Sequence, residues 1–210
     1  MTPLTVAVDG PAAAGKGTLA RRLALTLDLP YLDTGVLYRA VGRRVLDAGA
    51  DPADPIAAET EAQRLMLPDL QRTDLRGPAM DAASSKVATI PGVRAALLAF
   101  QREFARTGAV LDGRDIGSVV LPGATVKLFV TAGLHRRAHR RWLEMQARGL
   151  DMPLAQVEAE IEARDTQDSG RAAAPLQAAW DAVALDTTDM DADAAFAAAL
   201  AIVRNRTGSA

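Results

Sequence analysis

The 210-residue chain contains no cysteine, which excludes a disulfide framework, a thiol nucleophile and a cysteine-based metal site. Its formal net charge is only −2, so bulk electrostatics do not favour nucleic acid or an anionic membrane as a partner. The N-terminus lacks the basic and long apolar regions of a signal peptide, and the late apolar run 194–203 is too short to span a bilayer. We therefore expect a globular cytoplasmic protein that needs neither nucleic acid nor membrane.

Lysine is also scarce, since the chain has only Lys16, Lys86 and Lys127. The first of them closes a Gly-x-x-x-x-Gly-Lys pattern. An apolar run at 5–8 precedes this pattern and predicts a buried strand, and the leucine spacing in 16–27 predicts a helix. Strand, loop and helix in this order are typical of a phosphate-binding P-loop.

The chemistry of the loop follows from its small residues, which let successive backbone N–H groups converge on phosphate oxygens. The helix start adds further N–H donors, and Lys16 adds a mobile charge for the β- and γ-phosphates. The residues predicted to bind the nucleotide are Gly10, Pro11, Ala12, Ala13, Ala14, Gly15, Lys16, Gly17 and Thr18. Most P-loops carry Ser or Thr directly after the lysine to hold Mg²⁺, whereas here Gly17 stands there and Thr18 follows.

The remaining pattern predicts an α/β fold, a P-loop NTPase core with a central parallel sheet flanked by helices. Apolar runs predict strands near residues 5, 29, 109, 125 and 182. Helices are expected at 16–27, 36–48, 53–66, 80–89, 92–106, 134–142, 153–166 and 193–204, with a loop at 67–78 and a frayed tail at 205–210. We expect one domain, 1–210, with an acceptor-binding excursion at 51–90 and a helical lid at 135–172.

Charged residues follow the buried strand at 109–111 directly, in the order Asp112-Gly113-Arg114-Asp115. One interpretation is a capping aspartate with a turn glycine. The other is an anion and metal site at the strand end, where Asp112 resembles the acid that helps hold Mg²⁺ in P-loop enzymes. Thr34 and Arg39 also follow a predicted strand, although an arginine such as Arg39 is more often a solvated helix residue.

The expected helix 134–142 carries four arginines and two histidines, and several interpretations compete for it. The i, i+4 spacing of His135 and His139 suits a metal, but neighbouring arginines repel a cation and no Glu lies between them. A nucleic-acid patch needs more basic surface than this. A plain solvated helix and an arginine-rich segment that closes over a polyphosphate both remain open.

Taken together, these motifs resemble the cytidylate kinase family of bacterial CMP/dCMP kinases. The motifs that carry the resemblance are 9–11, 15–18, 32–35 with Tyr38 and Arg39, 83–88, Pro91, 93–94, 112–117, 137–141, and 164–176. They cover nearly the whole chain. The resemblance implies ATP-dependent phosphorylation of CMP and dCMP to CDP and dCDP, with ATP and Mg²⁺ bound by a monomer.

The resemblance also implies a role for each matching residue. Arg39, Arg114 and Arg171 match positions that hold the acceptor phosphate, and Ser85, Arg94 and Asp115 match positions that read the cytosine. Asp168 matches a ribose ligand, and Thr34 stands where the family often has Ser. Arg137 and Arg164 match donor-side arginines of the lid. We expect Lys16, Arg114, Arg164 and Arg171 to be catalytic, and Thr18 and Asp112 to hold Mg²⁺ directly or through water.

One stretch departs from the family. The segment 67–73 is too short for the usual insert that forms a small sheet over the acceptor site, and Ala79 replaces the usual acid after Leu75-Arg76. The missing insert and acid bear on how well the acceptor base is selected. They do not affect the expected phosphate site. Three other functions compete. One is a related kinase that acts on AMP, UMP or shikimate, and another is nucleic-acid binding by 136–141. The third is a GTPase-type switch, but the chain lacks the Asn-Lys-x-Asp motif that such a switch uses to read guanine.

Overall fold

The structure, a computed structural model, describes residues 3–171 and 174–208. The chain forms two compact units, one made of residues 1–32 and 107–210 and the other of residues 33–106. The P-loop and the segment predicted as a lid belong to the first unit. The whole stretch 51–90, predicted as an acceptor-binding excursion, belongs to the second unit, which extends beyond it at both ends.

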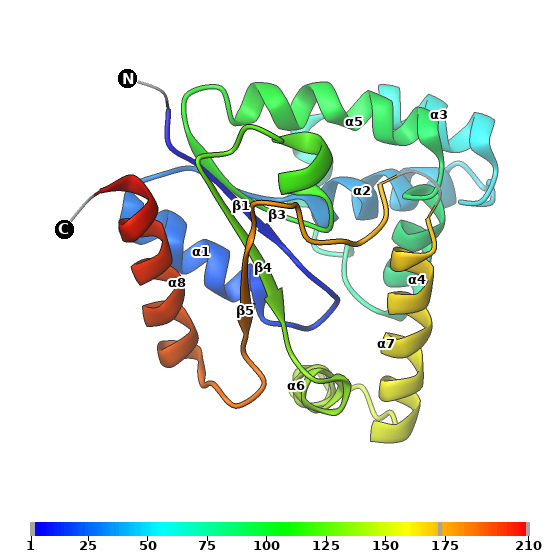
Figure 1. The fold of residues 1–210 in the computed structure, drawn as a ribbon. Coiled ribbons are helices and arrows are strands. Elements are labelled where there is room, and N and C mark those ends of the chain that lie inside the picture. Colours follow the sequence, from blue (N-terminus) through cyan, green and yellow to red (C-terminus); the bar gives the residue numbers. More distant parts are fainter. Residues whose placement is uncertain (1–2, 172–173, 209–210) are drawn as a thin grey trace. The chain divides into compact units, whose positions relative to one another are not determined.

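A five-stranded sheet lies at the centre of the first unit (Figure 1). Its strands are β1 (Thr5–Asp9), β2 (Tyr31–Asp33), β3 (Ala109–Asp112), β4 (Val126–Thr131) and β5 (Val183–Asp186). Their order is β2-β3-β1-β4-β5, and β1 pairs in parallel with β3 and β4 while β4 pairs in parallel with β5. The carboxyl ends of β1, β3 and β4 therefore meet at one edge, where α/β proteins bind ligands.

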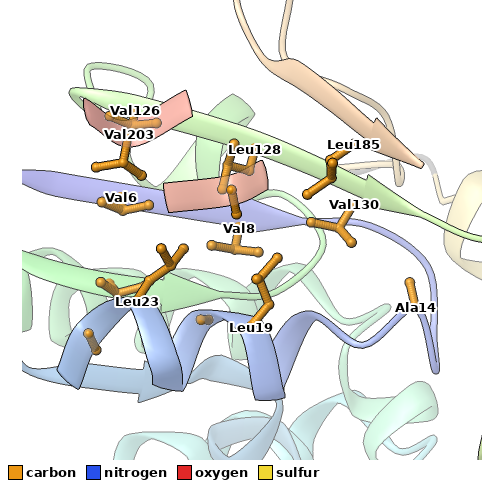
Figure 2. Packing of buried hydrophobic residues seen from close by; sticks show 14 residues of the cluster. Val6, Val8, Ala14, Leu19, Leu23, Val126, Leu128, Val130, Leu185 and Val203 are labelled. Carbon is orange, nitrogen blue, oxygen red and sulfur yellow. The ribbon is translucent and has the colours of Figure 1, made fainter. Parts of the chain in front are cut away.

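The helices of the first unit are α1 (Lys16–Leu27), α6 (Leu134–Gln146), α7 (Leu154–Ser169) and α8 (Ala192–Thr207), with a π-helical turn, η2, at Ile116–Val120. Figure 2 shows Leu19 and Leu23 of α1 and Val203 of α8 gathered around Val6 and Val8 of β1. All five side chains are almost fully buried. Burial of this apolar layer holds α1, and with it the start of the P-loop helix, against the sheet.

The second unit contains α2 (Thr34–Asp47), α3 (Pro55–Gln63), a 3₁₀-helix η1 (Leu67–Gln71), α4 (Pro78–Val87) and α5 (Pro91–Phe104). The helices α2 and α4 approach closely at Gly42, where a Cβ would lie 3.0 Å from the Ala83 Cβ. Similarly, a Cβ at Gly92 of α5 would lie 2.1 Å from an oxygen of Glu59 in α3. Glycine at position 42 therefore allows α2 and α4 to pack closely, whereas the contact at Gly92 is with the flexible end of the Glu59 side chain.

The predicted fold class is confirmed, since a parallel sheet flanked by helices forms at the predicted strands. Some local expectations were wrong. The helix predicted at 153–166 continues to Ser169, and the tail expected to fray is helical as far as Thr207. The stretch 67–78, expected as a loop, begins with the 3₁₀-helix η1, and the helix expected at 53–66 ends at Gln63. The turn at 116–120 was not predicted. No helix within the described residues is long and apolar enough to cross a membrane.

Candidate active site

A loop of small residues joins β1 to α1, and its backbone requires glycine at two places. Gly10 has a φ of 145°, and a Cβ there would lie 1.9 Å from the Val130 carbonyl oxygen. Gly15, directly before α1, has a φ of 87°. Other residues rarely adopt such angles, and none fits the close approach at Gly10. The loop therefore has the turns that bring successive N–H groups toward one point, as a phosphate site needs.

Lys16 is the first residue of α1 and is buried in spite of its charge, with 7% of its surface exposed. Its Nζ donates a hydrogen bond of 2.8 Å to the carbonyl oxygen of Pro11. The side chain thus crosses back over the loop instead of extending into solvent. An ammonium group in this place can move a short distance to contact the phosphates of a nucleotide bound by the loop.

Asp112 ends β3 and lies close to the start of α1. One of its carboxylate oxygens accepts a hydrogen bond of 3.1 Å from the Tyr31 hydroxyl. A Cβ at Gly17 would lie 3.3 Å from the other carboxylate oxygen and 3.6 Å from the Tyr31 hydroxyl. The close approach explains why a glycine, with no side chain, suits the position after Lys16.

The oxygen atoms at this place are of the kind that binds Mg²⁺. Thr18 lies exposed in the first turn of α1, one residue after the Gly17 that Asp112 approaches. Magnesium prefers hard oxygen ligands and takes only one or two from protein, with the others from phosphates and water. A hydroxyl and a carboxylate beside a P-loop satisfy this preference.

A buried carboxylate, Asp168, holds two of the predicted arginines together. Asp168 is 0% exposed, and its oxygens accept a hydrogen bond of 2.8 Å from Arg114 and a second one from Arg171. Burial alone would raise the pKa of this carboxyl, but the charges of Arg114 and Arg171 hold it below its ordinary value. The cluster therefore fixes two guanidinium groups at one place, a suitable arrangement for binding a phosphate dianion.

The helices α6 and α7 carry the predicted lid arginines and pack together around Ala138, Met145, Val157 and Ile161. Arg137 of α6 is almost fully buried and donates three hydrogen bonds. Its acceptors are the carbonyl oxygens of Ala132 at 2.8 Å and Ala12 at 3.1 Å, and the carboxylate of Asp165 at 2.6 Å.

These bonds connect the P-loop to both helices through one guanidinium group. Arg164 directly precedes Asp165 in α7, and its charge is among those that hold the pKa of Asp168 down, so the second predicted lid arginine lies near the Asp168 cluster.

Asp115 follows Arg114 in the chain and directly precedes the turn η2. The residue is buried, with 5% of its surface exposed. Its backbone carbonyl accepts hydrogen bonds from Val119 and Val120 at 2.9 and 3.1 Å, so the backbone around it is held by the turn. A carboxylate buried at a strand end can read a hydrogen-bond donor of a bound ligand, because water competes little with it there.

The second unit brings its four predicted residues to α2, α4 and α5. Arg39 of α2 donates a hydrogen bond of 2.8 Å to Asp33, and the guanidinium of Arg94 of α5 lies 5.9 Å from the ring centre of Tyr38. Ser85 of α4 and Thr34, at the start of α2, are 8% and 3% exposed. Thr34 and Ser85 are thus buried, whereas Arg39 and Arg94 are partly exposed and can reach a ligand from the surface of this helical unit.

The sequence did not reveal the groups that orient the predicted residues. Tyr31 binds Asp112 from 81 positions away, and Asp165 binds Arg137 from 28 positions away. Asp33 binds Arg39, and it was named only within the motif 32–35. The first two pairs are too distant in sequence to leave a local pattern.

Comparison with known proteins shows the family of the chain. A family model described as cytidylate kinase matches residues 6–205. A protein named cytidylate kinase from Acidiphilium cryptum (strain JF-5) is 62% identical over 202 residues, which cover 96% of this chain and 95% of that protein. One of the same name from Paramagnetospirillum magneticum (strain ATCC 700264 / AMB-1) is 58% identical over 206 residues, with coverages of 96% and 98%.

A crystal structure of an uncharacterized protein from Eubacterium ventriosum ATCC 27560 is similar with a TM-score of 0.56 and 12% identity, covering 95% of this chain and 98% of that chain. That likeness concerns the fold alone. The family match and the two relatives extend over nearly the whole length, and the matched residues 6–205 contain the P-loop, the Asp112–Asp115 segment and the helices α6 and α7. The chain therefore belongs to the cytidylate kinase family.

Proposed function

We propose that the protein transfers the γ-phosphate of ATP to CMP and dCMP, forming CDP and dCDP. The observation that supports this most, beside the family, is that one compact unit contains both a P-loop with a buried lysine and a buried carboxylate that holds two arginines. The P-loop with its lysine suits the nucleotide that donates the phosphate, and the pair of arginines suits an acceptor that carries a phosphate of its own. A GTPase-type switch would have no use for the acceptor cluster.

On the donor side, residues 10–18 bind the phosphates of ATP through backbone N–H groups and the Lys16 ammonium. Arg137, which binds the Ala12 carbonyl, contributes a guanidinium from α6 beside the loop. Thr18 and Asp112 hold Mg²⁺ directly or through water, and the ion neutralises charge on the β- and γ-phosphates when it is bound.

On the acceptor side, Arg39, Arg114 and Arg171 bind the phosphate of CMP. Asp115 and Ser85 accept hydrogen bonds from the exocyclic amine of cytosine, and Arg94 donates to the ring. Asp168 takes the ribose, while Thr34 adds a hydroxyl. A site built from such groups rejects a base with the wrong donors because buried polar atoms would be left unpaired.

The transfer step needs little covalent chemistry from the protein. A phosphate oxygen of CMP attacks the γ-phosphorus in line, its new P–O bond forms, and the bond from the γ-phosphorus to the bridging oxygen of ADP breaks with its electrons on ADP. The attacking oxygen is already anionic, so no strong general base is required. Four cationic side chains stabilise the negative charge on the transferring phosphoryl group, because the fold holds them in place before the reaction starts. They are Lys16, Arg114, Arg164 and Arg171.

We also propose that the enzyme is a cytoplasmic monomer, since every group that the reaction requires comes from one chain and both nucleotides are cytoplasmic metabolites. Light scattering during size-exclusion chromatography, with and without nucleotides, tests the oligomeric state. A dimer that forms only with both substrates would contradict this proposal.

The function is tested by measuring ADP release from Mg·ATP with CMP, dCMP, UMP, AMP or no acceptor, side by side. Turnover with CMP and dCMP well above the others is expected. Comparable turnover with UMP would keep the kinase function but mean that the short η1 segment leaves the base poorly selected. Turnover that is independent of any acceptor would contradict the proposal and favour a switch protein.

A further inference from the structure

Asp9 is a buried carboxylate for which the proposed reaction has no use. It is the last residue of β1, directly before Gly10 of the P-loop, and is 4% exposed. Its two oxygens accept hydrogen bonds of 2.7 Å each, one from the backbone N–H of Ile116 and one from that of Gly117. The start of the P-loop is thus tied to the turn η2, more than a hundred residues later in the chain.

The segment that Asp9 binds is the one that carries two proposed acceptor ligands. Arg114 and Asp115 lie between β3 and the turn that begins at Ile116. At the other end of this short segment, the Gly113 N–H donates to the Val8 carbonyl at 3.0 Å. The two ligands are therefore held between two attachments to β1, and the Asp9 carboxylate provides the attachment on the side of Asp115.

The turn η2 is also packed tightly against the side chains of Lys127 and Asp9. A Cβ at Gly117 would lie 3.1 Å from the side chain of Lys127 and 3.3 Å from an oxygen of Asp9. The Lys127 ammonium donates to the Pro122 carbonyl at 2.6 Å and to Asp181 at 2.8 Å, so its side chain is itself fixed. A turn supported on both sides moves little unless one of its hydrogen-bond partners changes.

Burying the charged Asp9 carboxylate costs desolvation free energy, which an apolar side chain at this position would not. The pKa of Asp9 is raised to about 6, chiefly by burial and also by the nearby Asp115, although the two N–H donors and Lys16 oppose the rise. Only a group with two acceptor oxygens satisfies both N–H donors at once. An amide of the same shape would turn an NH₂ group toward one of them.

We propose that Asp9 is a positioning residue for base selectivity, and that it acts by fixing the backbone of Asp115 relative to the P-loop. This inference rests on the proposed function, because it assigns Asp9 to the cytosine-reading side of that reaction. Asp9 itself touches neither nucleotide. It couples the loop that binds the donor to the segment that recognises the acceptor.

The test is Asp9→Asn, with kcat and KM measured for CMP and for UMP at saturating Mg·ATP. A change in ATP binding lowers turnover with both acceptors alike, so the ratio of their kcat/KM values reports the acceptor segment alone. The ratio is expected to fall on the order of tenfold, mainly through a higher KM for CMP, because small displacements of a recognition group have large effects.

Asp191→Asn is the matched control. The Asp191 carboxylate also accepts two backbone N–H groups, from Asp193 at 3.0 Å and Ala194 at 2.8 Å, but at the exposed start of α8. Asparagine caps helices as well as aspartate does, so this control should keep the wild-type CMP-to-UMP ratio and stability.

Gly117→Ala is the second variant, for use if Asp9→Asn does not fold. It keeps the carboxylate and disturbs the same turn, because the added Cβ would crowd both the Asp9 carboxylate and the Lys127 side chain, and the ratio should fall in the same direction. A folded variant that loses stability but keeps the wild-type CMP-to-UMP ratio, or that loses turnover equally with both acceptors, would overturn the inference. A wild-type enzyme without CMP-dependent turnover would instead overturn the proposed function, so the two failures are distinguishable.

Discussion

Arg137 of α6 donates a hydrogen bond of 3.1 Å to the carbonyl oxygen of Ala12, in the middle of the P-loop. The same guanidinium binds Asp165 of α7, so one side chain connects the donor loop to both helices of the proposed lid. A planar group with five donors can make such a set of bonds at once, whereas an ammonium group cannot. The connection makes Arg137 the most direct test of how these helices take part in transfer.

We predict that Arg137→Lys lowers kcat on the order of 10²-fold, as the loss of a well-placed donor does. Lysine keeps the charge but cannot reach the acceptors on the P-loop, α7 and the end of β4 together. Arg136→Lys is the control, because the exposed Arg136 binds only the Thr188 carbonyl at 3.0 Å among the contacts described. Steady-state kinetics should show near-normal turnover for the control, and an equal loss in both variants would contradict a specific role for Arg137.

Lys16→Ala should lower kcat by roughly 10²- to 10³-fold, because it removes a charge that stabilises the transferring phosphoryl group. Lys86→Ala is a suitable control. That lysine is half exposed and pairs with Asp51 on the surface of the second unit. ADP release with CMP as acceptor measures both variants, and near-normal turnover in Lys16→Ala would mean that the loop is not a nucleotide site.

Asp115→Ala should relax the preference for CMP over UMP, since the buried carboxylate is proposed to accept from the cytosine amine. Uracil carries a carbonyl in place of that amine, so the native carboxylate repels it and the alanine does not. The ratio of kcat/KM values for the two acceptors should fall on the order of tenfold or more. An unchanged ratio would remove Asp115 from base reading, whatever happens to overall activity.

Much of the fold follows from local sequence pattern. The helix predicted at 16–27 has the bounds of α1, because its leucines are spaced for one apolar face and Gly15 immediately precedes it. The parallel sheet was also predicted from local pattern, because each strand contains a short apolar run. The ends of elements were less predictable. The final helix α8 continues to Thr207 because Gly208 provides a left-handed cap, with a φ of 67°.

The features that local pattern could not show depend on contacts between distant residues. The turn at 116–120 forms where Asp9, 107 residues earlier, binds its first N–H group. Asp168 was predicted only as a ribose ligand, yet it is also the buried partner of two arginines. The positions of candidate residues could be taken from the sequence, but not the side chains that orient them, because burial and pairing are properties of the folded chain.

Asp168→Asn should lower the free energy of unfolding by about 3–5 kcal/mol at neutral pH, because it leaves the buried Arg171 and the partly buried Arg114 without their anion. The pKa of Asp168 is held below its ordinary value in the folded chain, so its stabilising contribution is present above that value and is lost as the pH falls through the folded pKa. Urea unfolding at several pH values measures the difference, which should narrow in acid. A difference that is the same at every pH would contradict the proposed ion pairs.

Asp9 should show the opposite pH dependence. Burial raises its pKa from 3.8 to about 6, so between these values the folded chain keeps a proton that the unfolded chain has lost. Its contribution to stability is therefore full below pH 4 and is lost as the pH rises through 6, a total of about 3 kcal/mol. Asp9→Asn does not titrate, so relative to this variant the wild type should lose that amount of unfolding free energy between pH 4 and pH 7. Urea unfolding of both proteins, with Asp191→Asn as control, measures the difference, and a constant difference across this range would mean that the Asp9 carboxyl ionises as it does in water.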